Sequence, residues 1–252
     1  MRGVWISLLV VACQAGEPPR APAAAAGEPA AEPARHEHPS RDEHPPQGAA
    51  PTPADHQHHG PIGHRFEDAE QWAKRFDDPS RDAWQMPRHV VDLMELRPAM
   101  HVVDLGAGTG YFIPHLSSAV GAQGRVIALD VEPDMVRYLK ARARREGLSN
   151  VEVRQVTSEE PGLEPSSVQR VLIVDTWHHL GARASYARKL AAALEPGGRV
   201  YVVDFTLETQ RGPPRDHRVA PEQVVSELSA GGLNARVLPE SLPDQYVVVG
   251  EK

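Results

Sequence analysis

The sequence predicts an α/β fold in which strands alternate with helices, and three observations support this. Short apolar runs alternate with longer stretches that carry apolar residues at helical spacing. The run over 101–104 ends in an acidic residue and is followed by glycines at alternate positions, which indicates a strand, a tight turn and the start of a helix. Residues 195–198 read Glu-Pro-Gly-Gly, a sequence that ends a helix and reverses the chain into the next apolar run.

The elements are predicted in the following order. Ahead of the first strand we expect a helix over 66–76 that is ended by Pro79, a loop over 81–87 and a second helix that opens at Pro87. The later helices are predicted at 112–120, 135–146, 186–194 and 221–230. The strands are predicted at the run that ends in Asp104 and at 125–130, 151–156, 170–175, 199–205, 235–238 and 245–250.

The 252 residues divide into three segments of different composition. Residues 1–13 have a basic start and a short apolar run, which resembles a secretory signal peptide, and 10–13 resemble the lipidation site of bacterial lipoproteins. Residues 14–64 are rich in Ala, Pro, Glu and His, and such a segment cannot bury enough apolar surface to offset its ordering entropy. We therefore expect a disordered tether there, followed by one globular domain over residues 65–252.

The N-terminal segments also predict a location. If Cys13 carries a lipid, the protein is anchored to the membrane of the cell envelope on the periplasmic side; the alternative is an uncleaved start and a cytoplasmic protein. The tether holds seven of the 13 histidines, a composition that can capture transition metals. No acidic or cysteine partner lies at the spacing of a structural metal site, so we favour a polar linker and predict no metal site.

The net charge of the chain is −7, which argues against a nucleic-acid partner held through its phosphates. Cys13 is the only cysteine, so no internal disulfide can form. The fold therefore does not depend on an oxidising compartment.

The stretch 103–110, Val-Asp-Leu-Gly-Ala-Gly-Thr-Gly, differs in spacing from the dinucleotide fingerprint G-x-G-x-x-G. A carboxylate at Asp104 would repel a pyrophosphate, but it suits a ligand that carries an ammonium beside a carboxylate. The stretch resembles the first motif of class I S-adenosylmethionine-dependent methyltransferases, and the Pro-Gly-Gly turn over 196–198 resembles a second signature of that family. The resemblance covers about residues 66–252. It implies a Rossmann-like sheet of seven mostly parallel strands with an antiparallel last strand, S-adenosylmethionine as the cofactor, and methyl transfer.

The resemblance places the cofactor at the ends of the first strands. Asp104 and the glycine loop would hold the methionine end, and Asp130, 24 residues past Gly106, would accept hydrogen bonds from the ribose hydroxyls. Thr157 stands where the family often has an aspartate for the adenine amine, a departure from the pattern. The predicted cofactor-binding residues are Asp104, Gly106, Ala107, Gly108, Gly110, Asp130, Val131, Thr157, Ser158 and Asp175.

Two adjacent histidines follow the fourth predicted strand, where the methyl group and its acceptor should meet. Histidine titrates near neutral pH, so His178 or His179 is predicted to be the catalytic base if the acceptor is protonated. The alternative is structural: one ring bonds to backbone and the other packs under a helix. An Asn/Asp-Pro-Pro-aromatic motif, common in DNA and protein amino-methyltransferases, is absent here, which favours a small-molecule acceptor.

Two other functions stay open on the sequence. One is a nicotinamide-dependent oxidoreductase, which the glycine spacing and Asp104 disfavour. The other is a non-catalytic, envelope-tethered binding protein that keeps the fold. The second alternative gains weight because S-adenosylmethionine is made in the cytoplasm, whereas the N-terminus resembles that of an exported protein.

Overall fold

The structure is a computed structural model that describes residues 66, 68–239 and 242–252. The signal, lipid anchor and tether predicted for residues 1–64 lie outside these residues. In the part of the chain that is described, no helix combines the length and the apolar character needed to cross a membrane.

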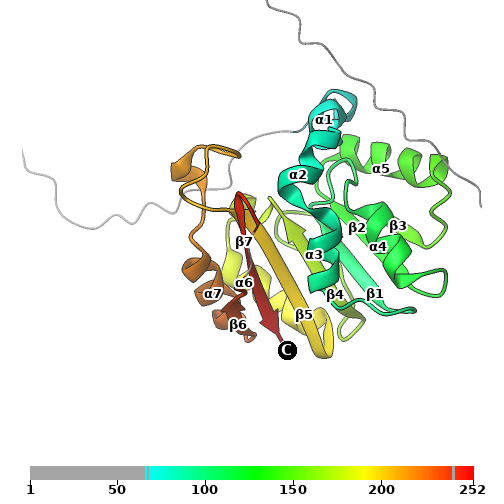
Figure 1. Ribbon diagram of the computed structural model, residues 1–252. Helices are drawn as coiled ribbons and strands as arrows, with labels where there is room; N and C mark the ends of the chain where they lie inside the picture. Colours follow the sequence, from blue (N-terminus) through cyan, green and yellow to red (C-terminus); the bar gives the residue numbers. More distant parts are fainter. Residues whose placement is uncertain (1–65, 67, 240–241) are drawn as a thin grey trace, which may run out of the picture. The chain divides into compact units, whose positions relative to one another are not determined.

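One seven-stranded sheet forms the centre of the domain, in the order β3-β2-β1-β4-β5-β7-β6 (Figure 1). Strands β1 to β5 are parallel, and β7 runs antiparallel to both β5 and β6. This confirms the predicted sheet with its antiparallel last strand. The strands are β1 (His101–Leu105), β2 (Arg125–Asp130), β3 (Val151–Gln155), β4 (Val168–Val174), β5 (Leu194–Phe205), β6 (Asn234–Val237) and β7 (Gln245–Glu251).

Helices cover both faces of the sheet, with α3, α4 and α5 on one face and α6 and α7 on the other (Figure 1). Crossovers between parallel strands are right-handed, and the strand order runs outward from β1 in both directions, so the helices of the two halves lie on opposite faces. The helices are α1 (Ala69–Phe76), α2 (Asp82–Gln85), α3 (Pro87–Leu93), α4 (Ile113–Val120), α5 (Pro133–Arg145), α6 (Arg183–Ala193) and α7 (Pro221–Ala230).

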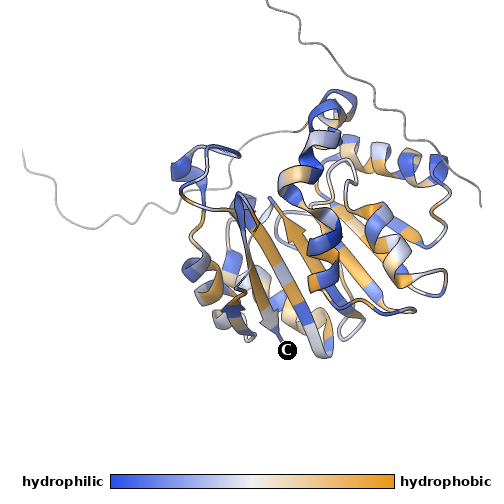
Figure 2. Ribbon diagram, in the orientation of Figure 1, coloured by the Kyte–Doolittle hydropathy of each residue, from blue (hydrophilic) through white to orange (hydrophobic). Residues whose placement is uncertain are grey.

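The central strands are mostly apolar because each of their faces meets a different set of helices (Figure 2). In β1, Val103 faces the cluster that includes the α6 and α7 side chains, whereas Val102 faces the cluster that includes Leu116 of α4. In β4, Ile173 and Leu172 alternate in the same way. This two-residue alternation is the expected geometry of a strand buried on both sides.

The segment before β1 differs from the prediction. The first helix begins at Ala69, after Asp68 caps it, and it ends at Phe76, so Phe66 precedes the helix. Pro79 does not end that helix but opens a 3₁₀ turn capped by Asp78, because proline is suited to the first position of a helical turn. The predicted loop over 81–87 is wrong, since the short helix α2 occupies most of it. Pro87 opens α3 as predicted.

The Pro-Gly-Gly segment lies within β5 rather than ahead of it. Leu194 pairs with Val168 and Arg199 pairs with Arg170, so the four residues 195–198 on β5 lie opposite the single residue Gln169 on β4. Gly197 absorbs the irregularity at a φ of +73°. Past it, β5 continues without interruption to Phe205, at the edge of the sheet where β1, β2 and β4 also end.

Candidate functional site

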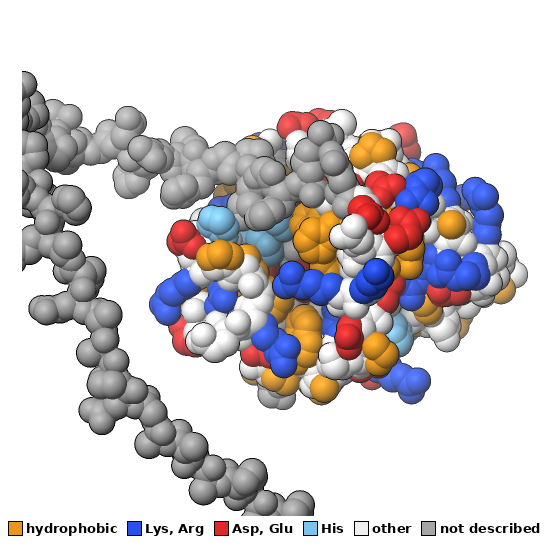
Figure 3. Space-filling model, turned by 90° about the horizontal axis from the view of Figure 1, so that it is seen from above, with side chains coloured by type: hydrophobic (Ala, Val, Ile, Leu, Met, Phe, Trp, Pro, Cys, Tyr) orange, Lys and Arg blue, Asp and Glu red, His pale blue; other side chains and the backbone are white. Residues whose placement is uncertain are grey.

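A cavity of about 870 Å³ opens at the carboxyl ends of β1, β2 and β4. Parallel sheets place their ligand sites at this edge, because the loops that leave the strands diverge there. Seen from this side, histidine side chains lie next to apolar side chains, with arginine and lysine around them (Figure 3). The volume is within the range of small-molecule sites.

The glycine loop after β1 forms one wall of the cavity. Gly106 and Ala107 donate their N–H groups to the carbonyl of Leu129, which ties the loop to the end of β2. Gly106 adopts a φ of +73°, and a Cβ there would lie 2.3 Å from Oγ1 of Thr176. At Gly108 a Cβ would meet only the ring of Phe76, at 3.7 Å, so this glycine leaves open space on the cavity side.

Asp130, at the end of β2, is fixed by backbone donors. Its Oδ2 accepts the N–H of Gly108 at 2.8 Å, and its Oδ1 accepts the N–H of Glu132 at 3.0 Å. Burial raises the pKa of Asp130, while the two backbone hydrogen bonds act in the opposite direction. The carboxylate is thus held rigidly beside the glycine loop, at the place predicted for a ribose contact.

Two further carboxyl groups face the cavity from the ends of β1 and β4. Burial, reinforced by the charge of Asp130, raises the pKa of Asp104 to about 7, and Arg81 opposes this. Burial also raises the pKa of Asp175, again against the charge of Arg81. A desolvated carboxylate gains most from a cationic partner, which the ammonium group of an amino acid would supply at Asp104.

The remaining predicted cofactor residues are divided between the cavity and the packing behind it. Val131, with 45 % of its surface exposed, lines the cavity together with Thr157 and Ser158 beyond β3. Gly110 faces away from the cavity: a Cβ there would lie 2.8 Å from Cδ2 of Leu139, in α5. Its absent side chain therefore allows the loop to approach α5 closely.

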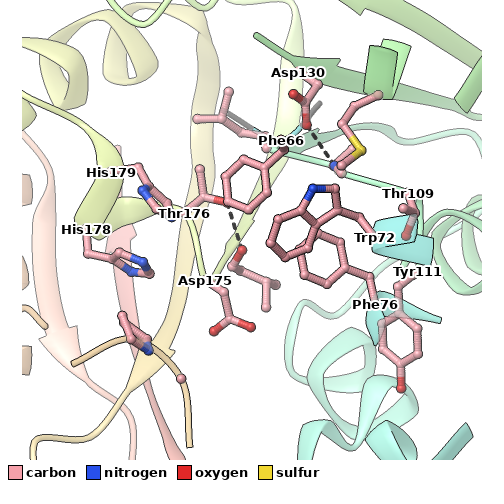
Figure 4. A pocket seen from close by; sticks show the side chains of 18 of the residues that line it. Phe66, Trp72, Phe76, Thr109, Tyr111, Asp130, Asp175, Thr176, His178 and His179 are labelled. Carbon is pink, nitrogen blue, oxygen red and sulfur yellow. Dashed lines mark hydrogen bonds between the residues drawn. The ribbon is translucent and has the colours of Figure 1, made fainter. Parts of the chain in front are cut away.

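Three aromatic rings cover the cavity from the segment before β1, which we call the cap (residues 66 and 68–86). Trp72 and Phe76 stack with ring centroids 5.2 Å apart, and Phe66 lies edge-on to Trp72 at 4.9 Å. Figure 4 shows these rings between Asp130 on one side and Asp175 on the other. The sequence pattern placed these aromatics on a helix without assigning them to the site.

The cap is tied to the rest of the domain by polar contacts with α5 and the glycine loop. Asp77 accepts hydrogen bonds from Arg142 and from the hydroxyl of Thr109, both at 2.9 Å. The N–H of Ala69 donates to Asp134 at 2.6 Å. Arg81 bonds the carbonyl of Phe76 at 2.9 Å, with its guanidinium carbon 4.2 Å from the ring centroid of Tyr111.

A ring of polar side chains joins the cap to the ends of β4 and β7. Arg81 donates to Oε1 of Gln85, Gln85 donates to Gln245, and Gln245 donates to Asp175. The other oxygen of Asp175 lies 3.6 Å from the guanidinium of Arg81, which closes the ring. Arg81, Gln85 and Gln245 were missed by sequence reasoning, because glutamines in a helix and at a strand start carry no recognisable motif.

The two predicted histidines have different surroundings. Nδ1 of His178 lies 2.9 Å from both carboxylate oxygens of Asp204, in β5. Burial lowers the pKa of His178, but the hydrogen bond and charge of Asp204, with the charge of Asp175, outweigh it and raise the pKa above its ordinary value. The ring of His179 lies edge-on to Phe66, with centroids 5.8 Å apart. Both histidines line the cavity, and the partner Asp204 was not predicted.

The described residues contain no group of three or more His, Cys, Asp or Glu side chains arranged to hold a metal ion. The cavity is instead lined by carboxylates, a glycine loop and aromatic rings. These groups fit an adenosine with an amino-acid tail: Asp130 for the ribose, Asp104 for the ammonium and the open face of Gly108 for the backbone of the tail.

The fold and the cavity define a class of protein, the Rossmann-like α/β proteins that bind a nucleoside cofactor at the ends of their parallel strands. A family model described as a methyltransferase domain matches residues 96–232, from just before β1 to the end of α7. The chain therefore belongs to the methyltransferase domain family, whose methyl donor is S-adenosylmethionine.

Known proteins share this domain. The ubiquinone/menaquinone biosynthesis C-methyltransferase UbiE of Idiomarina loihiensis is 28 % identical over 120 residues, which is 47 % of this chain and 48 % of that protein. The UbiE protein of Hydrogenovibrio crunogenus is 29 % identical over 124 residues, 49 % of each chain. This chain thus spans about half the length of the curated relatives it matches.

Solved structures extend the likeness beyond that region. A SAM-dependent methyltransferase from Aquifex aeolicus is 29 % identical, with a TM-score of 0.68 over 73 % of this chain and 98 % of the other. The [4+2]-cyclase SpnF, at 15 % identity and a TM-score of 0.57 over 68 % of this chain and 80 % of the other, shares the fold alone.

Proposed function

We propose that this protein transfers a methyl group from S-adenosylmethionine to a small-molecule acceptor. The observation that carries the proposal is the pairing of Asp104 and the open glycine loop with Asp130, fixed 2.8 Å from the loop N–H of Gly108. The family match and the 29 % identical structure from Aquifex aeolicus support the same cofactor. The match also speaks against the nicotinamide-dependent alternative.

The cofactor, when bound, supplies an electrophilic methyl group on a sulfonium. The residues of this chain contribute binding and alignment, which are worth up to ~7–11 kcal/mol in a reaction between two held partners. Asp104 pairs with the ammonium, Asp130 holds the ribose, and Val131, Thr157 and Ser158 surround the base. The cap rings exclude water, and Asp175, His178 and His179 face the acceptor.

The acceptor is proposed to be small and largely apolar. The cavity of about 870 Å³ has room for a nucleoside cofactor and one compact partner. The apolar residues that line it include Trp84, Leu180 and Phe205. The relatives named UbiE are C-methyltransferases of quinone biosynthesis, which is consistent with a compact ring system.

Calorimetry with S-adenosylmethionine, S-adenosylhomocysteine and NADH tests the cofactor. We expect the first two to bind and NADH not to bind, and NADH binding alone would overturn the proposal. Transfer of a labelled methyl group to a panel of small ring acceptors tests the activity. If the cofactor binds and no acceptor in a broad panel is labelled, the result favours a non-catalytic binding protein. The cyclase SpnF shows that this fold also occurs in a protein whose name is not that of a methyltransferase.

We also propose that Cys13 carries a lipid that anchors the domain in the cell envelope. The proposal is supported by the basic start and apolar run of residues 1–13 and by the Ala/Pro/His-rich composition of residues 14–64. Fractionation of cells, with mass analysis of the N-terminal peptide, tests it. An acylated Cys13 in the membrane fraction, lost in Cys13→Ser, is expected; an intact Met1 in the soluble fraction would contradict it.

A further inference from the structure

The buried pair formed by His178 and Asp204 sits at the acceptor side of the cavity. The side chain of Asp204 is 1 % exposed and that of His178 is 3 % exposed. One oxygen of Asp204 also accepts the N–H of Phe205 at 2.9 Å, which fixes the carboxylate. Nδ1 of His178 is directed at Asp204, and His178 lines the cavity. The other ring nitrogen, Nε2, is therefore the one that can reach a molecule bound in the cavity.

The aromatic rings of Phe205 and Trp84 lie next to this pair. Phe205 follows Asp204 in β5, and its ring lies 5.8 Å from the ring of Trp84 at an interplanar angle of 32°. The guanidinium carbons of Arg81 and Arg211 lie 5.7 Å and 5.4 Å from the Trp84 ring centroid. A flat apolar molecule can rest against these rings. Arg81 and Arg211, which pair with Asp175 and Asp244, place two cations beside it.

We infer that His178, positioned by Asp204, removes the proton from a weakly acidic hydroxyl on a planar, apolar acceptor, such as a phenol or an enol. The inference rests on the proposed function and names its substrate class. The acceptor O–H bond breaks and its proton passes to Nε2 of His178. The oxygen forms the bond to the methyl carbon, and the carbon–sulfur bond breaks with its electron pair left on sulfur. Charge is balanced, because the sulfonium becomes a neutral thioether and the imidazole becomes an imidazolium.

Asp204 is a positioning residue in this scheme, since it touches the base and not the acceptor. It holds Nδ1 protonated before the reaction and stabilises the imidazolium after it. The charged and titratable groups that surround the pair belong to several elements. They are Asp175 after β4, His179 in the turn after it, Arg183 in α6 and Tyr246 in β7.

The experiment follows the ionisation of 2-naphthol bound to the enzyme saturated with S-adenosylhomocysteine. Naphthol and naphtholate differ in near-ultraviolet absorption, which reports the ground state, so the measurement does not depend on turnover. We expect bound 2-naphthol to ionise at a lower pH in the wild type than in His178→Gln or Asp204→Asn. Asp204→Glu should restore part of the difference, and 2-methoxynaphthalene, which has no proton to lose, should show no pH-dependent change.

The controls separate this inference from the proposed function. Asp92→Asn, a matched change at an exposed carboxylate of α3, should behave as the wild type, and all variants should bind S-adenosylhomocysteine within twofold of it. Failure of that binding in the wild type would count against the proposed function. If S-adenosylhomocysteine binds but 2-naphthol does not, the proposed acceptor class is wrong. If bound 2-naphthol ionises at the same pH in the wild type and in His178→Gln, His178 is not the base. His178→Gln decides the point even if Asp204→Asn does not fold.

A labelled-methyl assay with 2-naphthol provides a second readout. A general base contributes about 10²–10⁴-fold, so kcat should fall by at least about 100-fold in His178→Gln while KM changes little. In Asp204→Asn the acid limb of the pH profile should move to lower pH, because the imidazolium loses its anionic partner. A kcat in His178→Gln equal to that of the wild type would overturn the assignment.

Discussion

Gln85 in the cap and Gln245 at the start of β7 are both fully buried, and the Nε2 of Gln85 lies 2.5 Å from the Oε1 of Gln245. The two residues are 160 positions apart in the chain. Their contact joins the segment that covers the cavity to the strand that completes the sheet. Through Asp175 and Arg81, the same contact reaches the centre of the site.

The cap should therefore depend on this amide pair. Gln85→Leu removes the donor to Gln245 and the acceptor for Arg81, and we expect a loss of about 1–3 kcal/mol in the free energy of unfolding, measured with urea. The double change with Gln245→Leu should cost less than the sum of the single changes, because it removes the unpaired amide. Strict additivity would show that the two side chains do not interact.

Gly106 and Gly108 should respond differently to alanine. In Gly106→Ala the new methyl group would overlap Thr176 at 2.3 Å with φ at +73°, and we expect a loss of about 2–4 kcal/mol in stability. In Gly108→Ala the methyl group meets only Phe76, at 3.7 Å, so only the left-handed backbone at φ +55° lowers stability, by about 1–2 kcal/mol, and the main effect should be weaker cofactor binding. Thermal denaturation and calorimetry measure the two effects separately. Equal loss of stability in both variants would contradict the distinction.

Asp130→Asn should weaken cofactor binding and also lower the free energy of unfolding, by about 1–3 kcal/mol. An asparagine can accept only one of the two backbone N–H groups that Asp130 now accepts. A hydrogen bond to a charged group is worth about 1.5–3 kcal/mol, so the affinity for S-adenosylhomocysteine should fall by roughly 10- to 100-fold. Asp92→Asn is the matched control, and an unchanged affinity in Asp130→Asn would remove the ribose assignment.

The raised pKa of Asp104 should make the free energy of unfolding depend on pH. Its pKa is about 7 in the folded protein and has an ordinary value of 3.8, so between these values the folded chain holds a proton that the unfolded chain has lost. The free energy of unfolding should accordingly fall as the pH rises from about 4 to about 7, and this contribution should vanish in Asp104→Asn. Urea titrations at several pH values measure it.

The carboxyl group of Asp104 should release a proton when the cofactor binds. An ammonium beside Asp104 favours the ionised carboxyl, so below pH 7 binding of S-adenosylmethionine should expel up to about one proton. Calorimetry in buffers of different ionisation enthalpy counts that proton. Binding without proton release in the wild type at pH 6 would place the ammonium away from Asp104.

The sequence by itself determined the order along the chain of the strands and of the helices other than α2, the acidic residue in β1 with the glycines after it, and the two histidines after β4. These features are local: they depend on side-chain periodicity and on backbone conformations that glycine and proline favour or exclude. Only the tertiary structure decided that Asp204 partners His178, that Gly110 faces α5, and that Arg81, Gln85 and Gln245 surround Asp175. Such contacts join residues that are far apart in the chain. Packing of the sheet and the cap removes these polar side chains from water, so each one must find its hydrogen-bond partner among the others.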